Sequence, residues 1–202
     1  MGYSAAGKNL MLDALGAAIT YVGILEADAA LTSVTITNAG DILTKASHGL
    51  SNGNLVVITE LTGGAGIIAG NANNADEAAR AYYIVGVNGN DFQLAEISGG
   101  SAITITSDGS CKVTRLVEIT GGSPAYAHKA IAWNAAANGS MDDSTNGAVF
   151  DMPASSTADY VGFFSALTNG TLYAIDKSTG ESFVGQGTLT LTDADIDLNA
   201  GA

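Results

Sequence analysis

Short β-forming runs separated by turn signals fill the middle of the chain, from residue 33 to residue 115. The strongest turn signal is Asn88-Gly89, which stands between the runs AYYIVGV and DFQLAEI and supplies the positive φ angles of a tight hairpin. The other runs are SVTIT, DILTKAS, NLVVITEL, AITIT and CKVTRL, and a glycine-rich loop is expected over residues 63–80. Seven runs in about eighty residues predict a small β-barrel or compact sandwich.

The segments on either side of this region read differently. One helix is predicted after Ser4, a suitable N-cap, because Met11, Leu12 and Leu15 fall on one face. Residues 19–25 (ITYVGIL) predict a buried strand that ends in a loop. Five or six further strands are expected in the ranges 127–133, 147–153, 157–167, 171–177 and 181–200.

We therefore expect a mainly β fold in two parts. A discontinuous, jelly-roll-like β-sandwich with one short N-terminal helix would be formed by residues 1–32 and 116–202. It would carry an inserted small β-barrel or sandwich domain of residues 33–115. A loop lengthened by a whole folded module is more typical of a display or assembly protein than of an enzyme built around a buried pocket.

Charge narrows the classes of partner. Acidic side chains outnumber basic ones by 20 to 7, which gives a formal net charge of −13. Such a field repels phosphate backbones, so direct nucleic-acid binding is not expected, and the excess is interpreted as a solvated surface that keeps the protein soluble. No apolar stretch approaches the roughly 20 residues of a membrane span. Lys8 and Asp13 in the N-terminal segment argue against a secretory signal.

Groups for acid–base or nucleophilic chemistry are scarce, with two histidines and one cysteine in the chain. Cys111 is expected to be a buried, inert thiol. His48 is expected to bond to the backbone in a turn, and His128 to lie at the surface or at a subunit contact. The sequence therefore predicts a protein that is not an enzyme and needs no cofactor.

One acidic cluster is a candidate calcium site. Asp193, Asp195 and Asp197 alternate along a predicted strand, so their carboxylates would share one face and offer the oxygen ligands that Ca²⁺ prefers. The segment lacks the glycine and distal glutamate of an EF-hand loop, and a solvated strand with a charged edge explains the same pattern. A metal-assisted hydrolase centred on these residues is the one enzymatic alternative.

Aromatic residues within the expected β-sandwich are a second candidate binding site. An aromatic platform for sugars could be built from them, but their placement within β runs favours packing in the core. The residues concerned are Tyr126, Trp133, Phe163, Phe164 and Tyr173.

Three stretches of the chain resemble a known family: SAAGKNLMLDAL followed by ITYVGIL, then TGGSPAYAHKAIAWNAA, then the closing series VFDMPASSTADYVGFFSAL, GTLYAID and ESFVGQGTLTLTDADIDLNA. They look like small structural proteins of tailed-bacteriophage virions, described as head-decoration, minor tail or tail-fibre-like proteins. The resemblance covers residues 1–32 and 116–202. The loop that is short in those relatives would hold the insert, which is similar to small β modules that recur in phage structural proteins.

This resemblance implies a non-enzymatic virion protein that is made in the host cytoplasm and located on the exterior of the particle. We expect a decoration or accessory role on the outside of the head or neck. There the sandwich would dock on other virion proteins, such as major capsid, neck or tail proteins, and the insert would face outward. The resemblance also implies a homo-oligomer, taken here to be a trimer.

The alternative is a minor tail or fibre-like adhesin whose insert binds a host surface glycan. An adhesin predicts an exposed contact surface at Tyr82, Tyr83 and Phe92, whereas a decoration protein predicts that these rings are buried. The solvent accessibility of the three rings therefore separates the two hypotheses.

Overall fold

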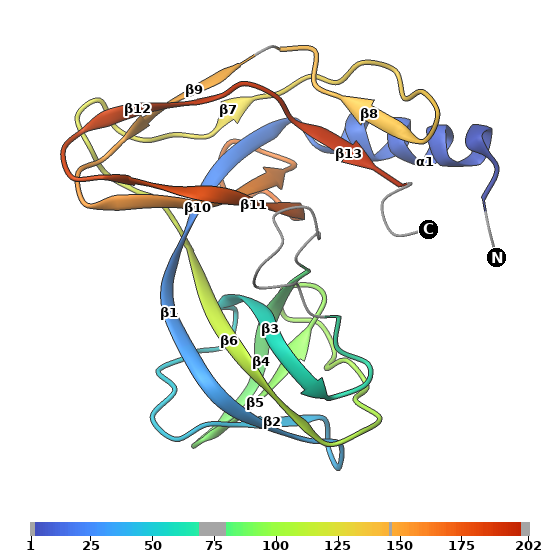
Figure 1. Cartoon of the computed structure of the whole chain (residues 1–202), viewed down its shortest axis with the longest axis vertical. Coiled ribbons are helices and arrows are strands. Elements are labelled where there is room, and N and C mark those ends of the chain that lie inside the picture. Colours follow the sequence, from blue (N-terminus) through green and yellow to red (C-terminus); the bar gives the residue numbers. More distant parts are fainter. Residues whose placement is uncertain (1–2, 69–79, 146, 199–202) are drawn as a thin grey trace.

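The structure, a computed structural model, describes residues 3–68, 80–145 and 147–198. Within these residues it is mainly β, with one helix, and all of its strand pairs are antiparallel. Figure 1 shows two lobes, a barrel built by the middle of the chain and a base built by its two ends. The mainly β fold with an N-terminal helix, predicted from the sequence, is confirmed.

Six strands close the barrel. In order around it they are β1 (Tyr21–Thr37), β2 (Ile42–Thr44), β5 (Asp91–Ala95), β4 (Ala81–Asn88), β3 (Leu55–Gly63) and β6 (Gly109–Glu118), and β6 pairs back with β1. The predicted hairpin joins β4 to β5, with Gly89 at a φ of +65°. Alternate side chains of these strands fill the interior. The largest are Ile36, Leu43, Ile58, Tyr82, Ile84, Phe92 and Leu94.

β1 is one continuous strand of 17 residues that belongs to both lobes. Its register with β6 shifts after Ala27 and after Leu31, and Ser33 has a φ of +53°. The loop expected after residue 25 is therefore wrong, because these irregularities bend the strand without ending it. The expected boundaries at 32/33 and 115/116 both fall inside strands, β1 and β6. The division into two domains stays a prediction.

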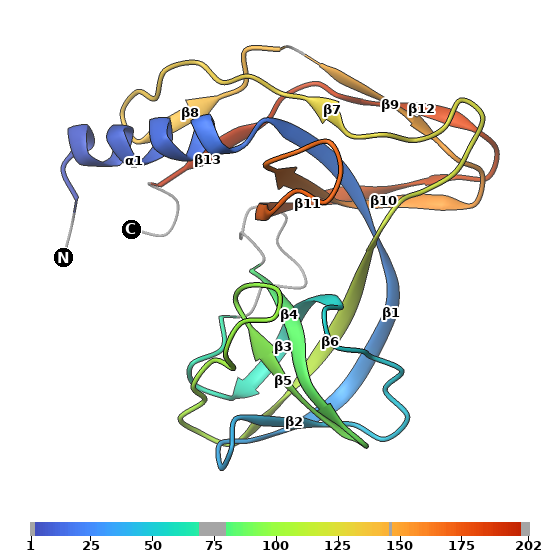
Figure 2. The same cartoon turned by 180° about the vertical axis from the view of Figure 1, so that it is seen from behind.

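The base is a β-sandwich closed at one end by the helix. Its remaining strands are β7 (Lys129–Ala130), β8 (Ser140–Asp142), β9 (Ala148–Met152), β10 (Ser156–Phe164), β11 (Leu172–Phe183), β12 (Gly187–Leu191) and β13 (Asp195–Asp197). The layer β11-β10-β1 continues the barrel sheet, the pair β9–β12 lies across from it, and the pair β8–β13 lies beside α1 (Figure 2). α1 (Ala5–Ala18) begins at Ser4, whose hydroxyl accepts the Gly7 amide at 3.2 Å, and lies beside β8 and β13.

The two lobes share a hydrophobic seam. On β3, Val56 and Ile58 point into the barrel, whereas Leu55 and Val57 lie on its outer face. This outer face packs against the base sheet, and Val57 at the contact is fully buried. The residues that join in the seam from the base strands β10 and β11 are Tyr160, Phe164, Leu172 and Ile175. The orientation of the barrel relative to the base is therefore set by apolar contact as well as by the paired strands β1 and β6, which we call the β1–β6 ribbon.

Three expected strands differ in the structure. Residues 102–106 form no strand, although they run beside β5, where the Ile103 amide donates to the carbonyl of Leu94 at 2.8 Å. The strand expected over 127–133 shrinks to β7, and the stretch 181–200 divides among the end of β11, β12 and β13. Of the glycine-rich loop at 63–80, residues 69–79 lie outside the described residues.

Candidate functional site

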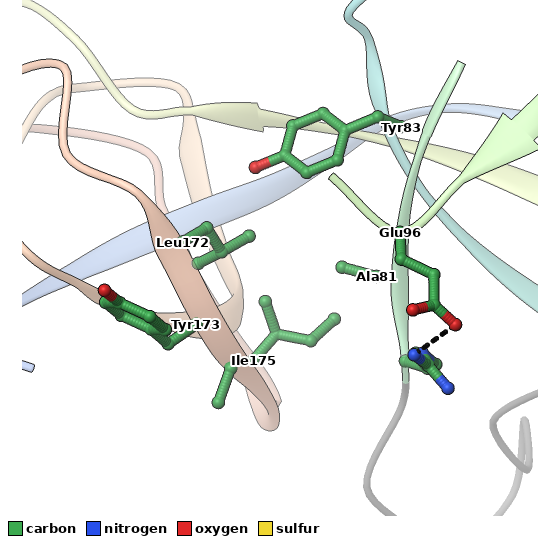
Figure 3. Close-up of a pocket in the computed structure, with 8 residues that line it drawn as sticks. Ala81, Tyr83, Glu96, Leu172, Tyr173 and Ile175 are labelled. Atoms are coloured by element: carbon green, nitrogen blue, oxygen red, sulfur yellow. Dashed lines mark ion pairs between the residues drawn. The ribbon is translucent and has the colours of Figure 1, made fainter. Parts of the chain in front are cut away.

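A cavity of about 300 Å³ opens where the barrel meets the base, at the rim of the seam (Figure 3). The barrel contributes Arg80, Ala81, Tyr83 and Glu96, and the base contributes the first residues of β11, Leu172 to Ile175. Arg80 Nη2 and Glu96 Oε1 are 2.6 Å apart and form an ion pair on one wall. Figure 3 shows Tyr83, Leu172 and Ile175 directed toward the space between β4 and β11.

The lining of this cavity offers both polar and apolar groups to a ligand. Burial raises the pKa of Tyr83, so its phenol stays protonated and can donate a hydrogen bond. The ion pair offers polar contacts, and Leu172 with Ile175 gives an aliphatic floor. The volume lies at the lower end of small-molecule sites, which span roughly 300–1,000 Å³. The cavity therefore has room for a small polar ligand.

The exposed aromatic contact surface predicted at Tyr82, Tyr83 and Phe92 is wrong at two of these three positions. Tyr82 is 1% exposed and Phe92 is 0% exposed, because both point into the barrel. Tyr82 is held there by its hydroxyl, which accepts the Ile68 amide at 2.8 Å. Tyr83, one residue later, points outward and lines the cavity. The alternation in Ala81-Tyr82-Tyr83-Ile84 was the signal that separates the two tyrosines.

The three aspartates of the calcium candidate are not gathered into a binding site. Asp193 precedes β13, while Asp195 and Asp197 lie exposed on it, opposite β8. In the part of the chain that the structure describes, no group of three or more His, Cys, Asp or Glu side chains is placed to hold a metal ion. The half-buried Ile196 between the two carboxylates fits the alternative of a strand with a charged edge.

His128 is buried, at 6% exposure, so its expected surface position is wrong. Its Nε2 is 2.7 Å from Glu118 Oε1, its Nδ1 is 3.3 Å from the carbonyl oxygen of Ala166, and its ring stacks on Phe164. Burial lowers the pKa of His128, but the bond to Glu118, the Glu118 charge and the Ala166 carbonyl together raise it above its ordinary value. Gly23 makes room for the imidazole, because a Cβ there would lie 2.5 Å from the His128 ring.

Two other predictions on reactive side chains are confirmed. His48 Nδ1 accepts the Leu50 amide at 2.9 Å, and its Nε2 lies 3.1 Å from the carbonyl oxygen of Gly89, so both ring nitrogens meet backbone groups. Cys111 is 3% exposed in the barrel core, and burial raises the pKa of its thiol to about 12. The raised pKa keeps the Cys111 thiol protonated at neutral pH.

The aromatic residues of the base mostly pack inside it. Tyr126, Phe163 and Phe164 are buried, Trp133 is half-buried, and Tyr173 is exposed. The buried and half-buried rings therefore follow the core-packing interpretation, and they do not form an exposed platform.

The sequence did not reveal which residues would meet to line the cavity. Arg80 and Glu96 stand at the ends of different strands, and β11 comes from the far end of the chain. Only the folded arrangement brings them together. Of the lining residues, only the outward direction of Tyr83 could have been predicted, because side chains alternate along a strand and Tyr82 points inward.

Comparison with known proteins adds no relative. No protein-family model matches the chain, and the searches of curated proteins and of solved structures find no match either. Across the residues that the structure describes, no helix has the length and apolar character needed to cross a membrane.

Proposed function

We propose that this chain is a non-enzymatic structural protein of a tailed-phage virion. It would decorate the outside of the head or neck, docked by its β-sandwich base, with the barrel facing outward. The observation that carries the proposal is the fixed mounting of a closed barrel on the base, through the β1–β6 ribbon and the buried seam. A rigid arm of this kind suits a protein that presents a surface at a set distance and angle from a support.

The motifs that carry the family resemblance have structural roles. Gln186, from the closing series, accepts the Ser123 amide at 2.8 Å and donates to the carbonyl of Pro124 at 2.9 Å, so it binds the TGGSPAYA stretch. In the same stretch, the Tyr126 hydroxyl accepts the Ile24 amide of β1 at 2.6 Å. Trp133 Nε1 donates to the carbonyl of Ile19 at 3.0 Å. These contacts hold the base together, which supports a structural role for the family motifs.

The partners proposed are other copies of this chain and neighbouring virion proteins, such as the major capsid or the neck and tail proteins. Stabilisation would come from apolar and backbone surface buried across subunit boundaries. The formal charge of −13 disfavours direct contact with packaged nucleic acid.

A re-binding experiment tests this proposal. Particles assembled without the protein should bind the purified chain back in a saturable, stoichiometric manner, measured by co-sedimentation and gel densitometry. A base that is trypsin-nicked or unfolded should not bind. Failure of the intact protein to bind such particles, or its absence from purified virions by mass spectrometry, would contradict the proposal.

The adhesin alternative retains one specific observation, the cavity beside Tyr83. A phenol, an ion pair and an aliphatic floor are groups that proteins use to bind sugars. Calorimetric titration with glycans from the host surface would detect binding, and Tyr83→Ala should abolish it. The control is Val184→Ala, which shortens a side chain of the base that is 93% exposed and does not line the cavity.

A further inference from the structure

α1 exposes the face that a surface helix normally makes polar. Leu10 is 72% exposed and Met11 is 43% exposed, while only Leu12 and Gly16 of the helix are buried. Tyr3, directly before the N-cap, is 61% exposed and stands next to Gly7. A helix that is apolar on its inner and its outer side is expected to be covered on both. This exposed stripe, which we call the outer stripe, comprises Tyr3, Ala6, Leu10, Ala14 and Ala17.

We infer that the outer stripe of α1 packs against the same stripe of a second copy of this chain, with the two helices antiparallel. The positions of the stripe are spaced symmetrically about Leu10, four and seven residues away on each side. In an antiparallel pair with its two-fold axis at Leu10, Ala6 faces Ala14 of the other copy and Tyr3 faces Ala17. Each bulky end residue then meets a small one, and the two Leu10 side chains meet at the axis. Such self-complementarity is what an isologous contact requires.

Charge also favours a second copy at this place. Two chains of net charge −13 repel one another over most of their surfaces. Residues 3–25 carry only Lys8 and Asp13, whose charges cancel, and neither belongs to the outer stripe. Asp13 is turned toward the base, where its Oδ1 accepts the Ala136 amide at 2.8 Å. Like-charged copies can therefore approach along the stripe at little electrostatic cost.

The size of the stripe sets the strength of the pair. A helix of 14 residues is about 21 Å long. One face of that length buries less than the roughly 800 Å² per partner of a typical stable interface. The alanines permit close approach of the two backbones, within the usual interaxial range of about 8–10 Å. We expect a reversible dimer that forms as the protein concentration rises, and this pairing does not depend on the proposed virion role.

Sedimentation velocity of the full chain over a range of concentrations tests the pairing. The wild type should shift from its 20.2 kDa monomer toward twice that mass. Leu10→Glu should abolish the shift, and Val184→Glu, at an apolar side chain that is 93% exposed in the base, should not. Circular dichroism should show both variants folded, since neither side chain is buried.

Cross-linking tests the antiparallel register. Under mild oxidation, Tyr3→Cys and Ala17→Cys variants should form a mixed disulfide with each other when combined, and neither should cross-link efficiently with itself. The native Cys111 is buried and should not interfere. A wild type that stays monomeric, a trimer, or a dimer that survives Leu10→Glu would overturn the inference. So would a monomer that binds virus particles through this stripe, because the occupant would then be another virion protein.

Discussion

Adjacent valines on β3 offer a direct test of how the barrel is attached to the base. Val56 and Val57 are both fully buried, but Val56 belongs to the barrel core and Val57 to the seam. Replacing either by alanine removes two buried methyl groups, worth about 1.6 kcal/mol of transfer free energy. The cavity left behind adds to this and brings the expected loss to about 2–3 kcal/mol for each variant. The two substitutions are chemically identical, so each is the control for the other.

The two variants should have similar free energies of unfolding, but they should differ in which strands exchange their amide hydrogens faster. Val56→Ala should speed exchange within the barrel strands and leave β11 unaffected. Val57→Ala should also speed exchange at β10 and β11, because side chains of these strands belong to the same buried cluster as Val57. Urea denaturation measures the free energy of unfolding, and exchange is followed by mass spectrometry of peptic fragments. Unchanged exchange of β11 in Val57→Ala would refute the idea that the seam fixes the barrel.

Three further predictions concern single side chains. Tyr126→Phe should lower the free energy of unfolding, measured by urea denaturation, by about 1–3 kcal/mol, because a buried β1 amide loses its acceptor. Tyr173→Phe, at an exposed ring, is the control. Equal stability of the two variants would count against this bond. The folded pKa of His128 is raised above its unfolded value of about 6.5, so the stabilisation by Glu118 is complete below that pH and is lost as pH rises through the folded pKa. Urea titrations of Glu118→Gln should lack this fall in stability, and a pH profile identical to wild type would exclude the pair as its source. Cys111 should resist iodoacetamide in the folded protein and react in denaturant, since burial raises the pKa of the thiol to about 12; rapid alkylation of the native chain would show that the barrel opens.

The local pattern of the barrel was predictable because its signals are short-range. Asn88-Gly89 fixes a hairpin through the backbone freedom of two residues, and alternation along each strand identifies inward side chains. The same alternation applied to Tyr82, Tyr83 and Phe92 separates the buried rings from the outward one. The burial of Cys111 and the backbone bonds of His48 follow from similarly local context.

The course of β1 and the cavity were not predictable in the same way. Residues 26–33 contain Glu26, Asp28 and several alanines, which resemble a loop in isolation, yet pairing with β6 on one side keeps them in the strand. Long-range pairing thus overrides weak local propensity. His128 looked like a surface residue because Phe164 and Ala166, which contact its ring, are distant in sequence.

A density map of the assembled particle tests the central proposal most directly. If the chain is a decoration protein, density for the base should lie on the outer shell of the head or neck, with the barrel directed away from it at the fixed angle seen in Figure 1. Density at the tail tip with the barrel turned toward the host cell would contradict a decoration role and favour the adhesin. Absence of the chain from the particle would contradict both.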